Sequence, residues 1–348
     1  MDVIKVLITG GGAPGIRGTL YSLKHNWDKR NVITVCVDMR TNAVGKYLCD
    51  RFYQVPPGTN RNFVSCLLDI CEKEHVDVVL PQVTLELLPL SIHLRKFKDI
   101  GTSIAISKTK AIEIANNKYK LLKIAKTVGI PAPKFVLVKK WDELLKAAEK
   151  LGFPFVIKPP VGSGMRGFRV IYKEIDRKRA FFEEKPDSTK TTLQDLYSIL
   201  GEKFPKLLAT EYLPGMEYSV DILSDESQVY TVIPRRRDHI RLGITFEGTV
   251  EKREDIINAS IKLSNKIGLE YAYGFQFKED INGIPKILES NPRIQGTMVL
   301  SSVAGANVIY GAVKLALGED IPLFNVRWGT KLLRYWGGIG IAEKVIEI

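Results

Sequence analysis

The sequence predicts an α/β domain with a doubly wound parallel sheet, followed by a largely antiparallel α+β region. Short apolar runs alternate with helical patterns over about the first 105 residues, and this alternation is typical of parallel strands joined by helices. From about residue 207 onward, longer strand patterns follow one another and are interrupted by one helical pattern at 252–267. The chain of 348 residues also exceeds what one hydrophobic core usually fills, so we expect more than one domain.

The elements of the first domain follow in order along the chain. A buried strand at 3–9 ends in glycines, and residues 15–26 suit a helix. Further apolar runs predict strands at 32–38, 52–55, 76–81 and 103–107, with helices at 60–74 and 84–97.

The second region begins with a helical pattern from residue 108 that stops at Gly129 and Pro131, because glycine and proline end helices. An amphipathic helix is expected at 141–152, and helices broken near 186–188 are expected over 174–200. A helix at 252–267 interrupts a series of strands at 207–213, 217–223, 228–235, 271–278 and 284–290. We expect the C-terminal KLLRYWGGIGIAEK to pack as an edge strand, with structural roles for Arg334 and Trp336.

Composition and charge exclude several classes of protein. Hydrophobic residues make up 45% and charged residues 26%, which excludes wholesale disorder, collagen and coiled coil. No apolar run approaches the ~18 residues of a membrane span, and no secretory signal is recognisable, so we expect a cytoplasmic protein. The four cysteines fit buried reduced thiols, and the histidine spacing predicts no zinc site. The net charge of +12 fits either an anionic ligand or a solvated, lysine-rich surface.

A glycine cluster, GGGAPG at Gly10–Gly15, follows the first predicted strand and precedes a helix. Its spacing fits G-x-G-x-x-G, and Asp38 ends the next strand. In dinucleotide-binding folds such glycines admit a pyrophosphate and the acid holds a ribose hydroxyl. One hypothesis is therefore an NAD(P)-dependent oxidoreductase. The alternative is a tight turn without a ligand, which Pro14 favours because proline has no backbone N–H.

Two later segments carry residues suited to phosphate and metal chemistry. Lys158 ends an apolar strand before the loop PPVGSGMRG, where an ammonium and bare backbone N–H groups suit phosphate binding; the alternative is a surface hairpin. The segment ILESNPRIQG places Glu289, Asn291 and Arg293 on one face of a strand, because side chains alternate. Their oxygens suit a hard cation and the arginine suits an anion, whereas the alternative is a polar solvent face. A hairpin would bring Gln276 near Glu289.

Together these segments resemble the ATP-grasp superfamily, in its carbamoyl-phosphate-synthetase-like and biotin-carboxylase-like branch. The matching motifs run from Lys118 in NNKYKLLKIAKTVGIPAP, through Lys158 and EYLPGMEYSVDI, to Q-F and E-S-N-P-R. The resemblance covers about residues 108–320. It implies a Rossmann-like pre-ATP-grasp domain at 1–107, a two-lobed ATP-grasp domain at 108–325 (flexible lobe about 120–205, C-terminal lobe about 206–325) and a C-terminal packing segment at 326–348.

The resemblance also assigns roles to residues that match the family's motifs. Lys118 and Lys158 match lysines that contact the nucleotide phosphates, and Lys158 and Arg293 are expected to be catalytic. The loop over the phosphates matches Gly162, Ser163, Gly164 and Gly167. Glu211 matches the acid that accepts from the adenine amino group, and Glu217 matches the acceptor of the ribose hydroxyl. The backbone of Tyr212 and Leu213 matches the hinge. The magnesium ligands match Gln276, Glu289 and Asn291.

Enzymes of this family make an acyl phosphate from a carboxylate and ATP, and a nucleophile then displaces the phosphate. The resemblance therefore implies an ADP-forming carboxylate–amine ligase that uses ATP and Mg²⁺, with Mn²⁺ as an alternative. Its expected partners are a small-molecule carboxylate and an amine, with no nucleic acid and no membrane; a homodimer stays open. Substrate contacts are expected from Arg235, Arg237, Arg241 and Arg293, although the first three also fit a solvated basic hairpin.

Departures from the family narrow this prediction. The chain has one ATP-grasp unit and no glutaminase, so it is not expected to be a complete carbamoyl phosphate synthetase. The Gln-Val-Glu-His-like run that follows the arginine in biotin carboxylases is replaced by Ile294, Gln295 and Gly296, so a biotin carboxylase is not expected. Two alternatives to a ligase remain, namely the oxidoreductase built on Gly10–Gly15 and Asp38, and a non-catalytic nucleotide-binding protein.

Overall fold

The computed structural model describes residues 3–162, 164–241, 243–335, 337–341 and 345–347. The chain divides into two compact units, and each unit is built from segments that are distant in sequence. Unit 1 comprises Met1–Ala115, Tyr218–Gln276 and Ser290–Ile348. Unit 2 comprises Asn116–Glu217 and Phe277–Glu289.

Unit 1 contains a five-stranded parallel sheet of order β3-β2-β1-β4-β5. Its strands are β1 (Ile4–Thr9), β2 (Val32–Asp38), β3 (Arg51–Gln54), β4 (Val78–Leu80) and β5 (Ser103–Ile104). The helices that follow them are α1 (Ile16–Lys24), α2 (Phe63–Glu74), α3 (Thr84–Ile92), α4 (Leu94–Asp99) and α5 (Thr109–Ala115), with a 3-10 helix at Val44–Tyr47. Because the order reverses between β1 and β4, the sheet is doubly wound, as predicted.

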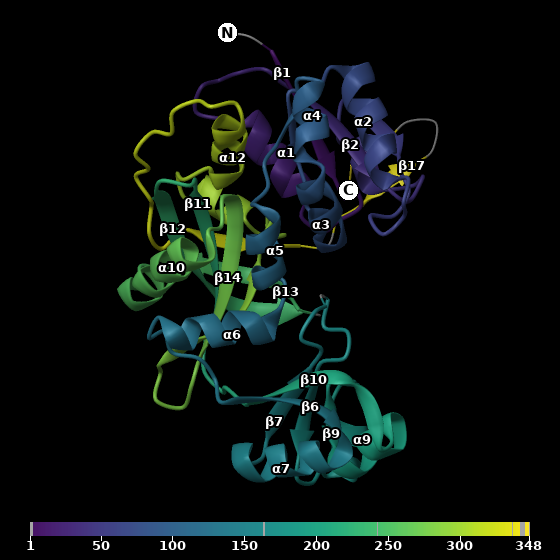
Figure 1. Ribbon diagram of the computed structural model, residues 1–348, viewed down its shortest axis with the longest axis vertical. Coiled ribbons are helices and arrows are strands. Elements are labelled where there is room, and N and C mark those ends of the chain that lie inside the picture. The colour runs from purple at the N-terminus through teal and green to yellow at the C-terminus, as the bar shows by residue number, and fades with distance from the viewer. Residues whose placement is uncertain (1–2, 163, 242, 336, 342–344, 348) are drawn as a thin grey trace. The chain divides into compact units, whose positions relative to one another are not determined.

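Helices cover both faces of this sheet. Ile4, Val6 and Ile8 point from β1 toward α1 and toward α12 (Val308–Ala316). Leu7 points to the other face and packs with residues of α2, α3 and α4, because successive strand residues alternate. The labels α1 and α2 in Figure 1 mark one helix of each layer. The two layers bury most of β1, β2 and β4, which explains the continuous apolar sequence of these strands.

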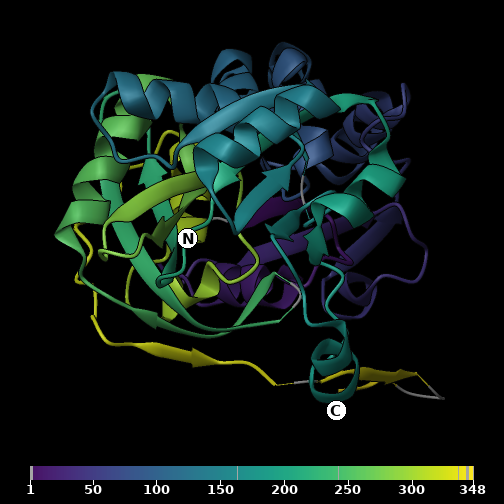
Figure 2. The same ribbon diagram turned by 90° about the horizontal axis from the view of Figure 1, so that it is seen from below.

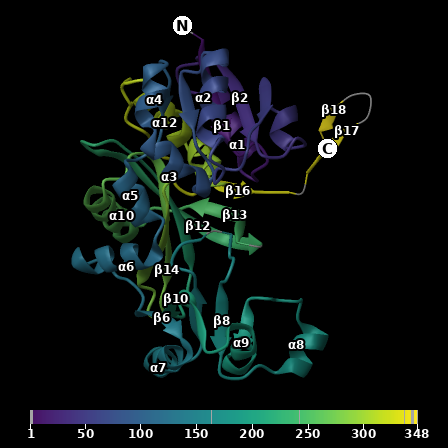
Figure 3. The same ribbon diagram turned by 45° about the vertical axis from the view of Figure 1, so that its right-hand side comes forward.

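A six-stranded sheet of order β15-β14-β11-β12-β13-β16 takes β12, β13, β16 and most of β11 and β14 from unit 1, whereas most of β15 falls in unit 2. Its strands are β11 (Glu217–Ser224), β12 (Val229–Arg241), β13 (Ile244–Val250), β14 (Tyr271–Glu279), β15 (Pro285–Asn291) and β16 (Lys331–Leu333). The accompanying helices are α10 (Glu254–Ile267), α11 (Val299–Val303) and α12. β16 pairs with β13 at the edge of the sheet, where Figure 2 shows the C-terminal segment in yellow. A hairpin of β17 (Ile339–Ile341) and β18 (Val345–Glu347) follows (Figure 3).

Unit 2 contains a second five-stranded sheet, of order β6-β10-β7-β8-β9. Its strands are β6 (Phe135–Lys140), β7 (Phe155–Lys158), β8 (Arg169–Tyr172), β9 (Lys190–Thr192) and β10 (Lys203–Glu211). Its helices are α6 (Lys118–Thr127), α7 (Trp141–Leu151), α8 (Arg177–Glu183) and α9 (Leu193–Leu200). Leu144 of α7 and Leu196 of α9 join the apolar side of this sheet, so the two helices cover one face (Figure 3).

The structure confirms the predicted fold class and refines several elements. β12 continues to Arg241, beyond the predicted end at residue 235, because the basic run stays paired with β13. The strand predicted at 103–107 is limited to Ser103–Ile104. The C-terminal edge strand is present at Lys331–Leu333, whereas Trp336 lies outside the described residues. The domain limits at residues 107 and 325 stay predictions. No helix in the described ranges has the length and apolar character of a membrane span.

Candidate active site

Lys118 stands at the start of α6 and faces the glycine loop of unit 2. The Asn117 side chain caps this helix by accepting from the Lys120 amide at 3.1 Å, which positions the lysine in the first turn. The Lys118 Nζ donates to the Gly162 carbonyl at 2.8 Å and lies 3.4 Å from the Glu289 carboxylate. The side chain is buried, so the ammonium is held between the loop and β15.

Lys158 ends β7 and is buried, as Lys118 is. Burial above all, together with the charge of Lys118, lowers the pKa of its ammonium to about 8, even though the charges of Glu289 and Glu217 act in the opposite direction. A buried ammonium costs free energy unless an anion compensates it. Lys118 and Lys158 act on Glu289, and Lys278 lies near Glu217, so three ammonium groups accompany two carboxylates, and this surplus of positive charge suits a phosphate.

The glycine loop needs conformations that other residues rarely adopt. Gly164 and Gly167 have φ values of +67° and +71°. A Cβ on Gly167 would also lie 2.8 Å from the Cγ of Pro159, so glycine is required there for space as well. Ser163, a predicted contact to the nucleotide, lies outside the described residues. The backbone on either side of it is glycine, as a loop that wraps phosphate oxygens requires.

The predicted nucleoside contacts lie at the end of β10 and the start of β11. The Glu211 carboxylate forms an ion pair with Lys286, which also lies 3.2 Å from Asp280. Glu217 lies 4.0 Å from the Nζ of Lys278. These two lysines were not anticipated from the sequence. Their positions on either side of the predicted turn at 280–283 were the available signal, because a hairpin brings its two arms close together.

The hinge between these two acids is shaped by the turn at Gly215. The Gly215 amide donates to the Glu279 carbonyl at 3.0 Å, and a Cβ at Gly215 would lie 2.6 Å from the Cβ of Glu279. Leu213 is buried, and the ring of Tyr212 has the Lys278 ammonium 5.8 Å from its centroid. The backbone of this segment is therefore fixed by packing rather than by its own helix or strand.

The predicted magnesium ligands occupy two neighbouring strands. Glu289 and Asn291 stand two residues apart on β15, and Gln276 stands on β14 beside it in the sheet order. All three side chains are partly exposed. Among them Glu289 supplies the only carboxylate, and within unit 2 it lies beside Lys118. The roles of Gln276 and Asn291 as ligands stay predictions.

Arg293 follows β15 and is fixed by three hydrogen bonds within unit 1. Its Nη1 donates to the Ile294 carbonyl at 2.8 Å and its Nη2 to Asn291 Oδ1 at 3.2 Å. Its Nε donates to Thr84 Oγ1 at 3.3 Å, at the start of α3. These contacts hold the guanidinium plane in one orientation. Such an orientation suits the two parallel hydrogen bonds that arginine makes with a carboxylate.

The three arginines predicted to contact substrate differ in their environments. Arg235 is 1% exposed, lies 2.6 Å from Asp221 and donates to Thr297. Arg237 is also buried and donates to Thr245 Oγ1 and to the Gly243 carbonyl. Arg235 and Arg237 therefore have structural partners that support β12, and their contacts to substrate stay predictions. Arg241 is exposed, with its guanidinium 4.9 Å from the centroid of the Phe246 ring, and stays a predicted substrate contact.

Substitution of Arg235 by alanine is expected to destabilise the fold by about 3–5 kcal/mol, because it leaves the Asp221 carboxylate buried without its cation. Chemical denaturation measures this loss, and Arg241→Ala is the matched control on the same strand. Stability equal to the wild type for Arg235→Ala would contradict the structural role assigned to the ion pair.

The N-terminal glycine cluster is explained by packing. A Cβ at Gly15 would lie 2.7 Å from the Cα of Gly296, so the two loops of unit 1 can approach only through glycines. Asp38 accepts from the Gly12 amide at 2.7 Å and from the Arg40 amide at 2.9 Å. Its two oxygens are thus engaged within the protein and not presented to a ribose. The structure therefore favours the turn over the dinucleotide site.

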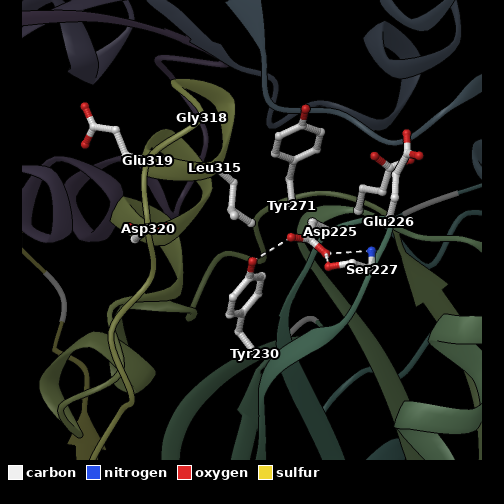
Figure 4. Close-up of a pocket in the computed structure, with 10 residues that line it drawn as sticks. Asp225, Glu226, Ser227, Tyr230, Tyr271, Leu315, Gly318, Glu319 and Asp320 are labelled. Atoms are coloured by element: carbon white, nitrogen blue, oxygen red, sulfur yellow. Dashed lines mark hydrogen bonds between the residues drawn. The ribbon is translucent and has the colours of Figure 1, made fainter.

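A cavity of about 430 Å³ in unit 1 lies outside the predicted site (Figure 4). Tyr230 donates to Asp225 at 2.6 Å, and Glu319 pairs with Arg30 at 2.8 Å. An acidic lining repels nucleotide phosphates, so this cavity is not a candidate for the active site. It is lined by Asp225, Glu226, Ser227, Tyr230, Glu270, Tyr271, Leu315, Gly318, Glu319 and Asp320.

Two parts of the chain match known protein families. Residues 6–105 match the family described as PylC-like, N-terminal domain. Residues 203–332 match the family described as ATP-grasp in the biosynthetic pathway with Ter operon. The chain therefore carries an ATP-grasp domain preceded by a PylC-like N-terminal domain, which confirms the predicted family resemblance.

Curated relatives and solved structures agree with these matches. The carbamoyl phosphate synthase large chain of Clostridium acetobutylicum is 23% identical over 74% of this chain, and the arginine-specific large chain of Halalkalibacterium halodurans is 25% identical over 86%. The chain spans only 24% and 27% of the length of these two relatives.

Solved structures show the same fold at low identity. The biotin carboxylase domain of the Hydrogenobacter thermophilus 2-oxoglutarate carboxylase, solved with MgADP and bicarbonate, has a TM-score of 0.71 at 17% identity, over 100% of this chain and 84% of that one. The N5-carboxyaminoimidazole synthetase of Staphylococcus aureus with ADP has a TM-score of 0.67 at 17% identity, over 93% and 80%. None of the similar proteins named above supports the oxidoreductase alternative.

Proposed function

We propose that this protein is an ATP-dependent ligase that activates a carboxylate as an acyl phosphate, releases ADP and transfers the acyl group to an amine. The observation that carries the proposal is the buried ammonium of Lys158, whose pKa is lowered to about 8 by burial, close to Lys118 and Glu289. Where buried ammonium groups outnumber the carboxylates near them, the excess positive charge favours an anionic ligand. The match to ATP-grasp domains supports a nucleotide as that ligand.

Different residues of unit 2 contact the phosphates, the ribose and the base of the nucleotide in this proposal. Lys118 and Lys158 hold phosphate oxygens, and the amides of Gly162, Gly164 and Gly167 add hydrogen bonds over them. Glu217 accepts from the ribose and the backbone of Tyr212 and Leu213 contacts the base. In this proposal Glu211 accepts from the adenine amino group only after its ion pair with Lys286 opens or is shared.

The Glu289 carboxylate and the amide oxygens proposed beside it fit a hard cation such as Mg²⁺ or Mn²⁺. When bound, such a cation neutralises charge on the transferred phosphoryl group. The side chains of the protein orient the reactants. Arg293 binds the carboxylate substrate through its planar guanidinium group, and Arg241 adds an exposed cation. Positioning of this kind supplies much of the rate enhancement in phosphoryl transfer.

Affinity for MgATP is expected to fall as the pH rises above about 8, because Lys158 then loses the proton that phosphate binding requires. The lowered pKa means that the ammonium is present below this value and absent above it. Calorimetry between pH 7 and pH 9.5 measures the trend. Lys158→Met should bind more weakly and lose the pH dependence, whereas Lys120→Met, which removes an exposed lysine on α6, should behave like the wild type.

Backbone amides of the loop at 162–167 are expected to become protected when nucleotide binds, because phosphate oxygens then accept from them. Hydrogen exchange with and without a non-hydrolysable ATP analogue tests this expectation. The turn at 280–283, which lies in the same unit, serves as the internal reference. Equal exchange in the loop in both states would show that it does not cover the phosphates.

A panel of carboxylates and amines tests the function itself through ADP release. Acetate, L-aspartate and L-glutamate serve as acids, and ethylamine, glycine and L-lysine as acceptors. We expect ADP release only when ATP, a divalent cation and an acid are all present, with an amide as the product. ADP release that is independent of every acid would favour a simple ATPase and contradict a ligase.

A further inference from the structure

Glu86 lies at the point where the parallel sheet of unit 1 reverses its strand order. β1 and β4 are neighbours there, and the Gln82 amide beyond β4 donates to Thr9 Oγ1 at the end of β1 at 2.9 Å. Glu86 stands in the first turn of α3, which follows β4 directly. Ligands of doubly wound sheets bind outside the carboxyl ends of the strands at this reversal.

The Glu86 carboxyl group is buried without full compensation. The side chain is 7% exposed, and its Oε2 has no hydrogen-bond partner among the described residues. Thr9 hydrogen-bonds to the carboxyl group, yet burial, together with the charge of Asp38, raises its pKa to about 7. Buried polar groups are nearly always paired, so an exception at a ligand-binding edge indicates a missing partner.

A cationic group of the site lies near the same turn. Arg293 Nε donates to Thr84 Oγ1 at 3.3 Å, and Thr84 precedes Glu86 by two residues in α3. A Cβ on Gly58 would lie 2.6 Å from the Cγ of Glu86, so the loop before α2 packs against the aliphatic part of this side chain. The arginine proposed to hold the acyl substrate therefore contacts the same first turn of α3 that carries Glu86.

We propose that Glu86 binds the ammonium group of the acceptor amine through Oε2 and removes a proton from it. This proposal rests on the proposed ligase function and deepens it. An ammonium supplies the N–H donors that the buried carboxylate lacks. An amine is protonated at neutral pH and cannot attack until it loses that proton.

Acyl transfer to the amine requires the loss of two protons from its nitrogen. The Glu86 carboxylate accepts one proton from R–NH₃⁺ and becomes a carboxylic acid, which leaves a neutral amine. The nitrogen lone pair forms a C–N bond to the acyl carbon, and the C–O bond to phosphate breaks with its electron pair on phosphate. Phosphate takes the second proton from nitrogen, and Glu86 returns its proton to solvent.

Hydroxylamine distinguishes the role of Glu86 toward the acceptor amine from the activation of the carboxylic acid by ATP. Hydroxylamine is largely uncharged at neutral pH and attacks acyl phosphates without a base, whereas ethylamine, glycine and L-lysine must first lose a proton. In Glu86→Gln we expect hydroxamate formation to persist while kcat/KM for the amine falls on the order of 10²–10⁴-fold. The loss should shrink as the pH rises, because the solvent then deprotonates the amine.

Glu74→Gln is the matched control, because Glu74, at the end of α2, is also a buried glutamate of unit 1 but is engaged by Arg51 and Tyr53. Its hydroxamate and amide rates should change together or not at all. If Glu86→Gln reduced both products equally, or reduced neither, the acceptor role of Glu86 would be wrong. If the wild type formed hydroxamate from none of the acids, the proposed function would fail, and this proposal with it.

A second measurement keeps the proposal testable without turnover. The carboxyl carbon of Glu86, assigned by its loss in Glu86→Gln, should titrate near pH 7 by NMR in the wild-type protein. Addition of ethylammonium should lower this pKa, because a bound cation favours the carboxylate. Tetramethylammonium, which has no N–H donor, should lower it much less. Identical titration curves with and without ethylammonium would overturn the proposed binding.

Discussion

Replacement of Glu289 by glutamine is expected to lower turnover by on the order of a thousandfold or more while the fold survives. The change removes a charge at nearly constant volume. It takes away the carboxylate proposed to ligand the divalent cation, and it also removes the anion that lies 3.4 Å from Lys118. Because the Glu289 charge raises the pKa of Lys158, that ammonium should also titrate at a lower pH in the mutant.

ADP release with saturating substrates measures this effect, and the melting temperature checks the fold. Glu149→Gln, on the exposed face of α7 in the same unit, controls for the loss of one negative charge. Raising the concentration of Mg²⁺ should restore little activity, because the missing ligand is needed for orientation as well as affinity. Turnover of Glu289→Gln close to that of the wild type would remove this residue from the proposed cation site.

Replacement of Arg293 by lysine is expected to leave affinity for MgATP nearly unchanged and to lower turnover on the order of 10²–10³-fold. The guanidinium makes three directed hydrogen bonds, to Ile294, Asn291 and Thr84. A lysine ammonium keeps the charge but cannot reproduce the planar guanidinium fork that these contacts hold in one orientation.

Calorimetry with MgATP and steady-state kinetics with the acid distinguish the possible roles of Arg293. Arg95→Lys is the matched control, since Arg95 is an exposed arginine on α4 of the same unit and has no proposed contact to substrate. If Arg293→Lys abolished MgATP binding while acyl transfer per bound nucleotide stayed intact, the arginine would belong to the nucleotide site. The assignment to the acid would then be wrong.

Much of the fold follows from patterns that are local in sequence. The apolar strands and the helices between them predict the doubly wound sheet, because strand alternation and the 3.6-residue helical period each have short-range signatures. β12 was predicted too short, since Arg236 and His239 look like a polar loop until pairing with β13 places them in a strand. Sheet pairing of this kind is decided by a distant segment of the chain.

The candidate site could be predicted only in part, for a related reason. Residue types and motif order indicate Lys118, Lys158 and Glu289, because charge and spacing are visible in the sequence. The buried ion pair of Arg235 with Asp221 is not visible there, since exposure depends on the neighbours that the fold supplies. The same holds for Glu86, a single acid in an apolar helix with no motif around it.

Transfer of oxygen from the acid to phosphate tests the central claim most directly. An acid labelled in its carboxylate with a heavy oxygen isotope is incubated with ATP, Mg²⁺ and an amine, and the released phosphate is analysed by mass spectrometry. Activation as an acyl phosphate predicts one labelled oxygen in each phosphate formed with the amide. The amine breaks the bond between the acyl carbon and the bridging oxygen, so this oxygen, which came from the acid, leaves with phosphate. Phosphate that carries no label while amide is formed would contradict this account.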